Sequence, residues 1–131
     1  MAGYNEVMVD RGAVLEWIAA YEEAWRTAGT GALADVFAAD VTYLPSPWAE
    51  PLRGLAALAE FWTSEREGAD EPFRMTSDIV AADGPTAVVR VEVHYGDGER
   101  WRDLWIVTFD DQGRCRTFEE WPFTPGQPDG H

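Results

Sequence analysis

The sequence predicts an α+β fold in which about three N-terminal helices pack on one face of a curved antiparallel sheet. Two observations carry this prediction. In the first half of the chain, apolar residues recur at three- and four-residue spacings, as they do on amphipathic helices. From Phe73 onward the period changes to two, and Gly/Asp turn signals return at nearly equal intervals, which is typical of an antiparallel meander.

Three helices are expected in the first half of the chain. The first begins after Asp10, a residue type that caps helix N-termini, and runs to about residue 28. A short second helix is expected around residues 33–37. The third opens at Gly54 and extends to about residue 67, with apolar residues again three and four positions apart.

Strands dominate the rest of the chain. A short strand over residues 41–44 precedes a loop around Trp48 that three prolines keep irregular. A chain of 131 residues is expected to form one domain, residues 1–131. Its core is expected at about residues 10–123, with a loose N-terminal arm and an irregular tail outside it. The four strands of the meander are expected at residues 75–82, 86–95, 101–109 and 115–121.

The composition excludes several classes of partner. The formal net charge is −14, which repels nucleic acid and anionic membranes. A single cysteine, Cys115, cannot form an internal disulfide, and this favours a reducing, cytoplasmic location. The two histidines, His94 and His131, are too few for a metal site, and no phosphate-binding loop is present, so neither a metal nor a cofactor is expected.

Six segments resemble the NTF2-like superfamily and its SnoaL-like (polyketide cyclase-like) branch. The resemblance implies a cone whose helices and concave sheet enclose a pocket for a small organic ligand, and a homodimer formed through the outer sheet face. Because this fold hosts isomerases, hydrolases, cyclases and non-catalytic binders, the resemblance implies no single activity. The segments are 21–25 (YEEAW), 33–41 (LADVFAADV), 50–54 (EPLRG), 102–105 (RDLW), 109–114 (FDDQGR) and 118–121 (FEEW).

Strand parity predicts the wall of this pocket once the resemblance assigns the concave face. Residues two apart on a strand share a face, so Trp101, Asp103 and Trp105 point the same way. Seven Trp, six Phe and four Tyr favour a flat, largely apolar ligand. The expected ligand-binding residues are Trp17, Trp25, Tyr43, Trp48, Trp62, Val91, Trp101, Trp105, Phe118 and Glu120.

Asp103 and Tyr21 are the candidate catalytic residues. A carboxyl between two indoles is desolvated, which raises its pKa and suits it to acid/base chemistry. The alternative is that Asp103 pairs with an arginine and organises the sheet. Tyr21 resembles the tyrosine that donates to an oxyanion in ketosteroid isomerases of the superfamily, and its alternative is a core role.

Other polar residues on the last strand have simpler expected roles. Arg116 shares the parity of Glu120 and is expected to neutralise it, whereas Cys115 has the opposite parity and is expected to face outward. Pro45 and Trp105 stand where the ketosteroid isomerases carry two acids, so a standard ketosteroid isomerase is not expected. The function expected is binding of a cyclic metabolite, with cofactor-independent isomerase, cyclase or hydrolase chemistry. The alternatives are a non-catalytic ligand-binding protein and a dimeric interaction module.

Overall fold

The computed structural model describes residues 7–66 and 72–129, which contain three helices and six strands. The helices precede most of the sheet, as the sequence pattern predicts. The elements are α1 (Arg11–Arg26), α2 (Leu33–Val36), β1 (Phe37–Leu44), β2 (Leu52–Arg53), α3 (Leu55–Glu65), β3 (Phe73–Asp83), β4 (Thr86–Tyr95), β5 (Arg100–Phe109) and β6 (Cys115–Phe123).

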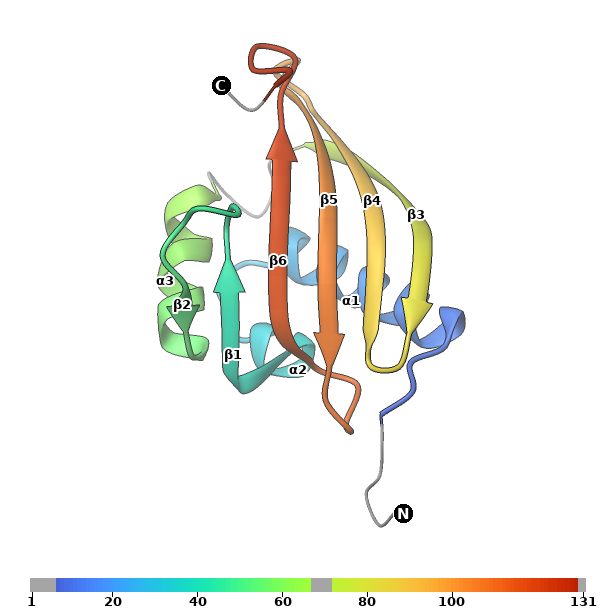
Figure 1. Ribbon diagram of the computed structural model, residues 1–131. Coiled ribbons are helices and arrows are strands. Elements are labelled where there is room, and N and C mark those ends of the chain that lie inside the picture. The colour runs from blue at the N-terminus through green and yellow to red at the C-terminus, as the bar shows by residue number, and fades with distance from the viewer. Residues whose placement is uncertain (1–6, 67–71, 130–131) are drawn as a thin grey trace.

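The strands form one open, curved, mixed sheet with the order β2-β1-β6-β5-β4-β3. The predicted antiparallel meander is confirmed for β3 to β6. The short strand β2 and the parallel pairing of β1 with β6 were not predicted, and the pairing makes the sheet mixed rather than wholly antiparallel. Figure 1 shows α1 and α2 behind the sheet and α3 beside β1 and β2.

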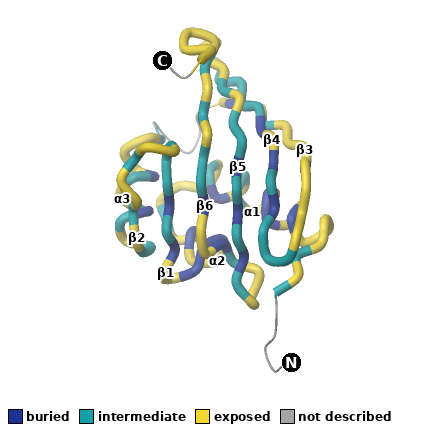
Figure 2. Tube along the Cα trace, viewed as in Figure 1, coloured by how far each residue is buried: buried dark blue, intermediate teal, exposed yellow. Residues whose placement is uncertain are grey.

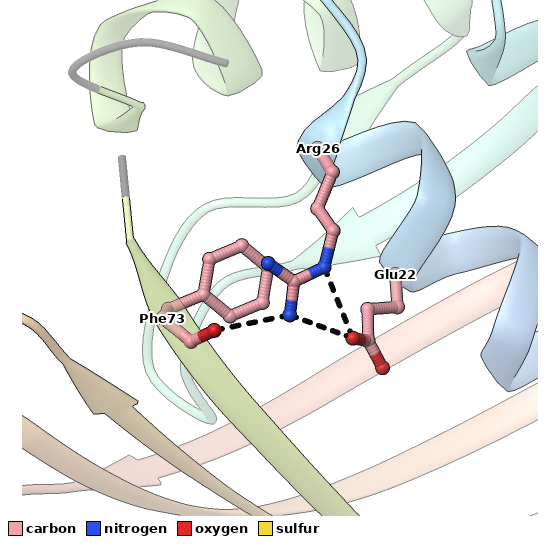
Figure 3. A network of polar contacts seen from close by, with 3 residues as sticks. All are labelled: Glu22, Arg26 and Phe73. Atoms are coloured by element: carbon pink, nitrogen blue, oxygen red, sulfur yellow. Dashed lines mark hydrogen bonds and ion pairs between the residues drawn. The ribbon is translucent and has the colours of Figure 1, made fainter. Parts of the chain in front are cut away.

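Helix α1 is held at both ends by side chains. The Asp10 carboxylate accepts a hydrogen bond from Ala13 N at 2.8 Å, so the predicted N-cap is confirmed. At the other end, Arg26 donates to Glu22 and to the carbonyl oxygen of Phe73 at 3.0 Å, as Figure 3 shows. The helix stops at Arg26 because Thr27 is extended, and this contact fixes the end of α1 to the start of β3.

The core lies between the sheet and the helices. Figure 2 shows buried positions along the central strands and on the helices behind them, with exposed positions in the turns. Trp17 is at its centre: the side chain is 4 % exposed, and its indole Nε1 donates to Val36 O at 2.9 Å. A buried indole N–H needs such a partner, so Trp17 joins α1 to α2 as well as filling space.

A β-bulge changes the faces at the start of β6. Phe109 pairs with Cys115 and Thr108 with Thr117, so Arg116 is an extra residue in β6. The prediction that Cys115 faces outward is therefore wrong: its side chain is fully buried, while Arg116 is exposed. The alternation resumes beyond the bulge, where Phe118 is buried as predicted.

The chain ends differ from expectation where they are described. Val9 N donates to Gly84 O at 2.8 Å, so the predicted loose arm is attached to the sheet at that residue. Residues 1–6 of that arm, the expected helix end at residue 67 and the last two residues of the tail lie outside the described residues. Within the described residues, no helix combines the length and apolarity needed to cross a membrane.

Replacing Asp10 by Ala is expected to destabilise the protein by about 1 kcal/mol, because the first turn of α1 loses its side-chain acceptor. Urea unfolding monitored by circular dichroism measures the change. Glu16, exposed on the same helix, supplies the control: Glu16→Ala removes an equal charge without removing a cap. Equal destabilisation by both variants would contradict the capping role.

Candidate functional site

A cavity of about 450 Å³ lies between the concave face of the sheet and helices α1 and α3. This volume falls in the range of small-molecule sites. Six of the expected ligand-binding aromatic residues line it: Trp25, Tyr43, Trp62, Trp101, Trp105 and Phe118. The expected catalytic residues Asp103 and Tyr21 also line it, as does Glu120.

Strand register brings Asp103 and Glu120 together. Trp105 is opposite Glu120 and Asp103 is opposite Pro122, so the two carboxyl groups are diagonal neighbours on one face. Tyr43 approaches from β1, where it pairs with Phe118 and stacks on its ring at 5.2 Å between centroids. From this position the Tyr43 hydroxyl donates a hydrogen bond to Glu120 Oε1.

Neighbouring residues supply only part of the hydrogen bonds that the Asp103 carboxyl group can make. Its Oδ2 accepts a long hydrogen bond of 3.4 Å from Trp105 Nε1. Its Oδ1 is buried and has no hydrogen-bond partner within the described parts of the chain. The expected alternative of an arginine partner is not found among these residues. Burial raises the pKa of Asp103, although the hydrogen bond from Trp105 partly lowers it.

Glu120 is the more strongly perturbed carboxyl group. Burial raises its pKa well above the ordinary value, and the nearby charge of Asp103 raises it further, while the hydrogen bond from Tyr43 opposes the shift. Arg116 was expected to neutralise Glu120, but this is wrong. Arg116 is the exposed bulge residue, and no ion pair joins the two among the described residues.

The two half-buried carboxyl groups therefore favour a state in which they hold one proton between them. This arrangement provides a base and an acid side by side in an aromatic cavity.

Two tyrosines add neutral donors to the same wall. Burial raises the pKa of Tyr43, and the Glu120 charge raises it further, so the phenol keeps its proton. Burial also raises the pKa of Tyr21, followed by the charges of Glu120 and Asp103. The Tyr21 ring lies 4.6 Å from Trp105 and 5.4 Å from Trp62, centroid to centroid, in the aromatic wall.

Three expected ligand-binding residues are not at the wall. Trp17 and Val91 are 4 % and 1 % exposed and belong to the core. Trp17 lies one turn before Tyr21 on α1, so it shares the inner stripe but lies at a different depth. Trp48 is 98 % exposed on the proline-rich loop, where no periodicity indicates the direction of a side chain.

Sequence reasoning also missed part of the wall. Phe61 and Met75 line the cavity, as do Glu65, Asp97 and Glu99. The available signal for Met75 was parity, because it lies two residues after Phe73 on β3 and pairs with Val93, which shares a strand face with the expected residue Val91. The turn residues Asp97 and Glu99 carry no such signal.

The pH dependence of stability tests the state of Glu120. Because its folded pKa is raised, its contribution to stability is complete below the unfolded pKa of about 4.3 and is lost as pH rises through the folded pKa. Glu120→Gln, a neutral analogue of the protonated acid, is therefore expected to gain stability relative to the wild type between pH 4.5 and pH 8. Urea unfolding across this range measures the difference.

The exposed Glu16→Gln variant controls for the loss of one negative charge. A stability difference between Glu120→Gln and the wild type that stays flat, or that narrows as the pH rises, would contradict the raised pKa.

Comparison with known proteins places this chain in a family. Residues 18–117 match the family model of the SnoaL-like domain. No curated protein matches. Solved structures of low sequence identity share the fold. SalBIII, described as an epoxide hydrolase/cyclase-like enzyme in pyran ring formation in the polyether salinomycin, is 15 % identical with a TM-score of 0.69, over 87 % of this chain and 93 % of that one.

Two further structures are similar. A steroid delta-isomerase from Pseudomonas aeruginosa is 16 % identical with a TM-score of 0.65, over 93 % of this chain and 87 % of that one. A protein of unknown function with a cystatin-like fold from Methylobium petroleophilum is 19 % identical with a TM-score of 0.69, over 95 % of this chain and 84 % of that one. At these identities the structures support the fold, and the match over residues 18–117 shows that the chain belongs to the SnoaL-like domain family.

Proposed function

We propose that this protein binds a small, largely apolar cyclic molecule in the aromatic-lined cavity and performs cofactor-independent acid/base chemistry on it. The observation that carries the proposal is the half-buried carboxyl pair of Asp103 and Glu120 at the wall of a cavity of about 450 Å³. Desolvated carboxyl groups with raised pKa values are suited to proton transfer near neutral pH.

The two carboxyl groups take different roles in this proposal. Asp103 is the ionised partner and accepts a proton from a carbon or hydroxyl group of the substrate. Glu120, supported by the Tyr43 hydroxyl, donates its proton to the substrate oxygen that gains electron density. Tyr21, kept neutral by burial, is a second donor for that oxygen.

Two observations narrow the reaction class. Proteins described as an epoxide hydrolase/cyclase-like enzyme and as a steroid isomerase share this fold, which supports isomerase, cyclase or hydrolase chemistry. Pro45 and Trp105 both line the cavity where the resemblance to ketosteroid isomerases would require acids. The proposal therefore excludes the standard ketosteroid isomerase mechanism.

The location proposed for the protein is the reducing cytoplasm, which the single buried Cys115 supports.

A general probe of a desolvated carboxylate base tests the catalytic part. 5-Nitrobenzisoxazole is a flat aromatic compound whose N–O bond breaks when a base removes the ring C–H proton, and the phenolate formed is coloured. Asp103→Asn is expected to lower the protein-catalysed rate by at least about 100-fold, because the base is lost. The free energy of unfolding should stay within about 1 kcal/mol of the wild type or rise, since a buried charge is relieved.

Asp111→Asn, in the exposed turn after β5, is the matched control and should leave the rate unchanged. Clear destabilisation by Asp103→Asn with an unchanged rate would make Asp103 a structural residue. Saturable binding of the probe with no turnover in the wild type would favour the alternative of a ligand-binding protein without catalysis.

The outer sheet face supports a second part of the proposal, a homodimer. Trp121 and Phe123 are 38 % and 37 % exposed at the end of β6, and Leu104 pairs with Trp121 on the face opposite Asp103. Val80, which has no partner in the register of β3 with β4, is a further apolar side chain that is 47 % exposed. Apolar side chains spread across a sheet face are typical of a surface that another protein covers.

Sedimentation velocity at micromolar concentration is expected to give a dimer for the wild type and a monomer for Leu104→Asp, because a buried aspartate would destabilise the interface. Leu15→Asp places the same charge on α1, at a leucine that is 55 % exposed, and should leave the dimer intact. A monomeric wild type would overturn this part of the proposal and leave the ligand site unaffected.

A further inference from the structure

The side chains that line the cavity carry acidic groups and no basic group among the described residues. Ten of the lining residues are aromatic, so the remaining wall is mostly π-surface and apolar. A concave site of one charge sign with low-dielectric walls concentrates ligands of the opposite sign. The acidic lining residues are Glu65, Asp97, Glu99, Asp103 and Glu120.

We propose, building on the function proposed above, that the cavity selects organic cations: an apolar ring system that carries a protonated amine. The ring occupies the aromatic interior, and the ammonium group lies near the mouth, where Asp97 and Glu99 lie in the turn between β4 and β5. Carboxylates and phosphates of the same size are repelled by the acidic lining.

The mouth carboxylates are held in place. Glu99 Oε1 accepts a hydrogen bond of 2.6 Å from Trp101 Nε1, and Asp97 Oδ1 accepts one of 2.9 Å from Glu99 N. The Trp101 indole is fixed beside the Glu99 carboxylate. An electron-rich ring face and a negative charge, the two groups that bind ammonium ions, therefore lie side by side. This preorganisation reduces the ordering cost of binding.

Two arginines that contact rings of the cavity wall are engaged with other groups. Arg26 lies over the Phe73 ring at 3.8 Å and pairs with Glu22, as Figure 3 shows. Arg66 lies 6.0 Å from the Trp25 ring, and its guanidinium donates to four carbonyl oxygens at and after the C-terminus of α1. Their charges are therefore compensated by an anionic side chain and by a helix C-terminus.

Trp62 adds ring surface to the wall. It lines the cavity and is 3 % exposed, and its Nε1 has no hydrogen-bond partner among the described residues. Because the Nε1 atom is itself enclosed by the protein, Trp62 offers a ligand its ring face and not its N–H group.

The experiment compares charge on a constant skeleton. Phenyl, naphthyl and adamantyl rings are each tested as the methylamine, the methanol and the carboxylate, by titration calorimetry at pH 7. At least one ring is expected to bind as the amine about fivefold or more tightly than as the alcohol, given the strength of cation–π and charge contacts. The carboxylate should not bind, and added salt should reduce the preference for the amine.

Variants of Asp97 and Glu99 test whether the ammonium group of the ligand binds at the mouth. Glu99→Gln keeps an acceptor for Trp101 and, with Asp97→Asn, is expected to reduce amine affinity toward that of the alcohol without changing alcohol affinity. Asp111→Asn removes the same charge in the turn at the other end of β5 and should change neither affinity. Alcohols that bind as tightly as amines, or carboxylates that bind best, would overturn the inference and leave the proposed function standing. Failure of every ring in every form to bind would overturn both.

Discussion

The parallel pairing of β1 with β6 is the constraint on which the site depends. Tyr43 and Phe118 are paired in this register, which stacks their rings and brings the Tyr43 hydroxyl to Glu120. Glu120 is half-buried on the concave face among aromatic rings, where an ionised carboxyl group without partners is unfavourable. The hydrogen bond from Tyr43 on β1 offsets part of that cost and opposes the rise in the pKa of Glu120.

Local patterns predicted most of the fold and some of the residues of the site. The cap at Asp10 and the alternation along β5 depend only on residues close in sequence, and both were correct. The same alternation, with the concave face assigned by the resemblance to the NTF2-like superfamily, predicted Asp103 and Glu120 on one face, as the strand register shows. By contrast, periodicity within a strand does not say which strand is its neighbour. The contact between Tyr43 and Glu120, 77 residues apart, therefore had no sequence signal.

The aromatic residues also show what local patterns do not predict. An amphipathic stripe shows which side of a helix is inside, but it does not distinguish the packed core from the wall of a cavity. Trp17 and Tyr21 belong to one stripe on α1, yet Trp17 donates to Val36 within the core and Tyr21 faces the carboxyl pair. Trp48 lies outside any stripe and is exposed, so its residue type alone was a poor guide.

The bulge at Arg116 makes the number of residues in β6 as important as their identity. Cys115 and Phe118 both face inward although they are three positions apart, because one residue between them is not matched by a residue of β5. Loss of Arg116 would leave Cys115 and Phe118 two positions apart, as on a regular strand, so the two residues would still share a face. Beyond the bulge the alternation is regular, so one residue inserted or deleted between Phe118 and Glu120 would turn Glu120 to the other face and separate the acid pair without altering either acid.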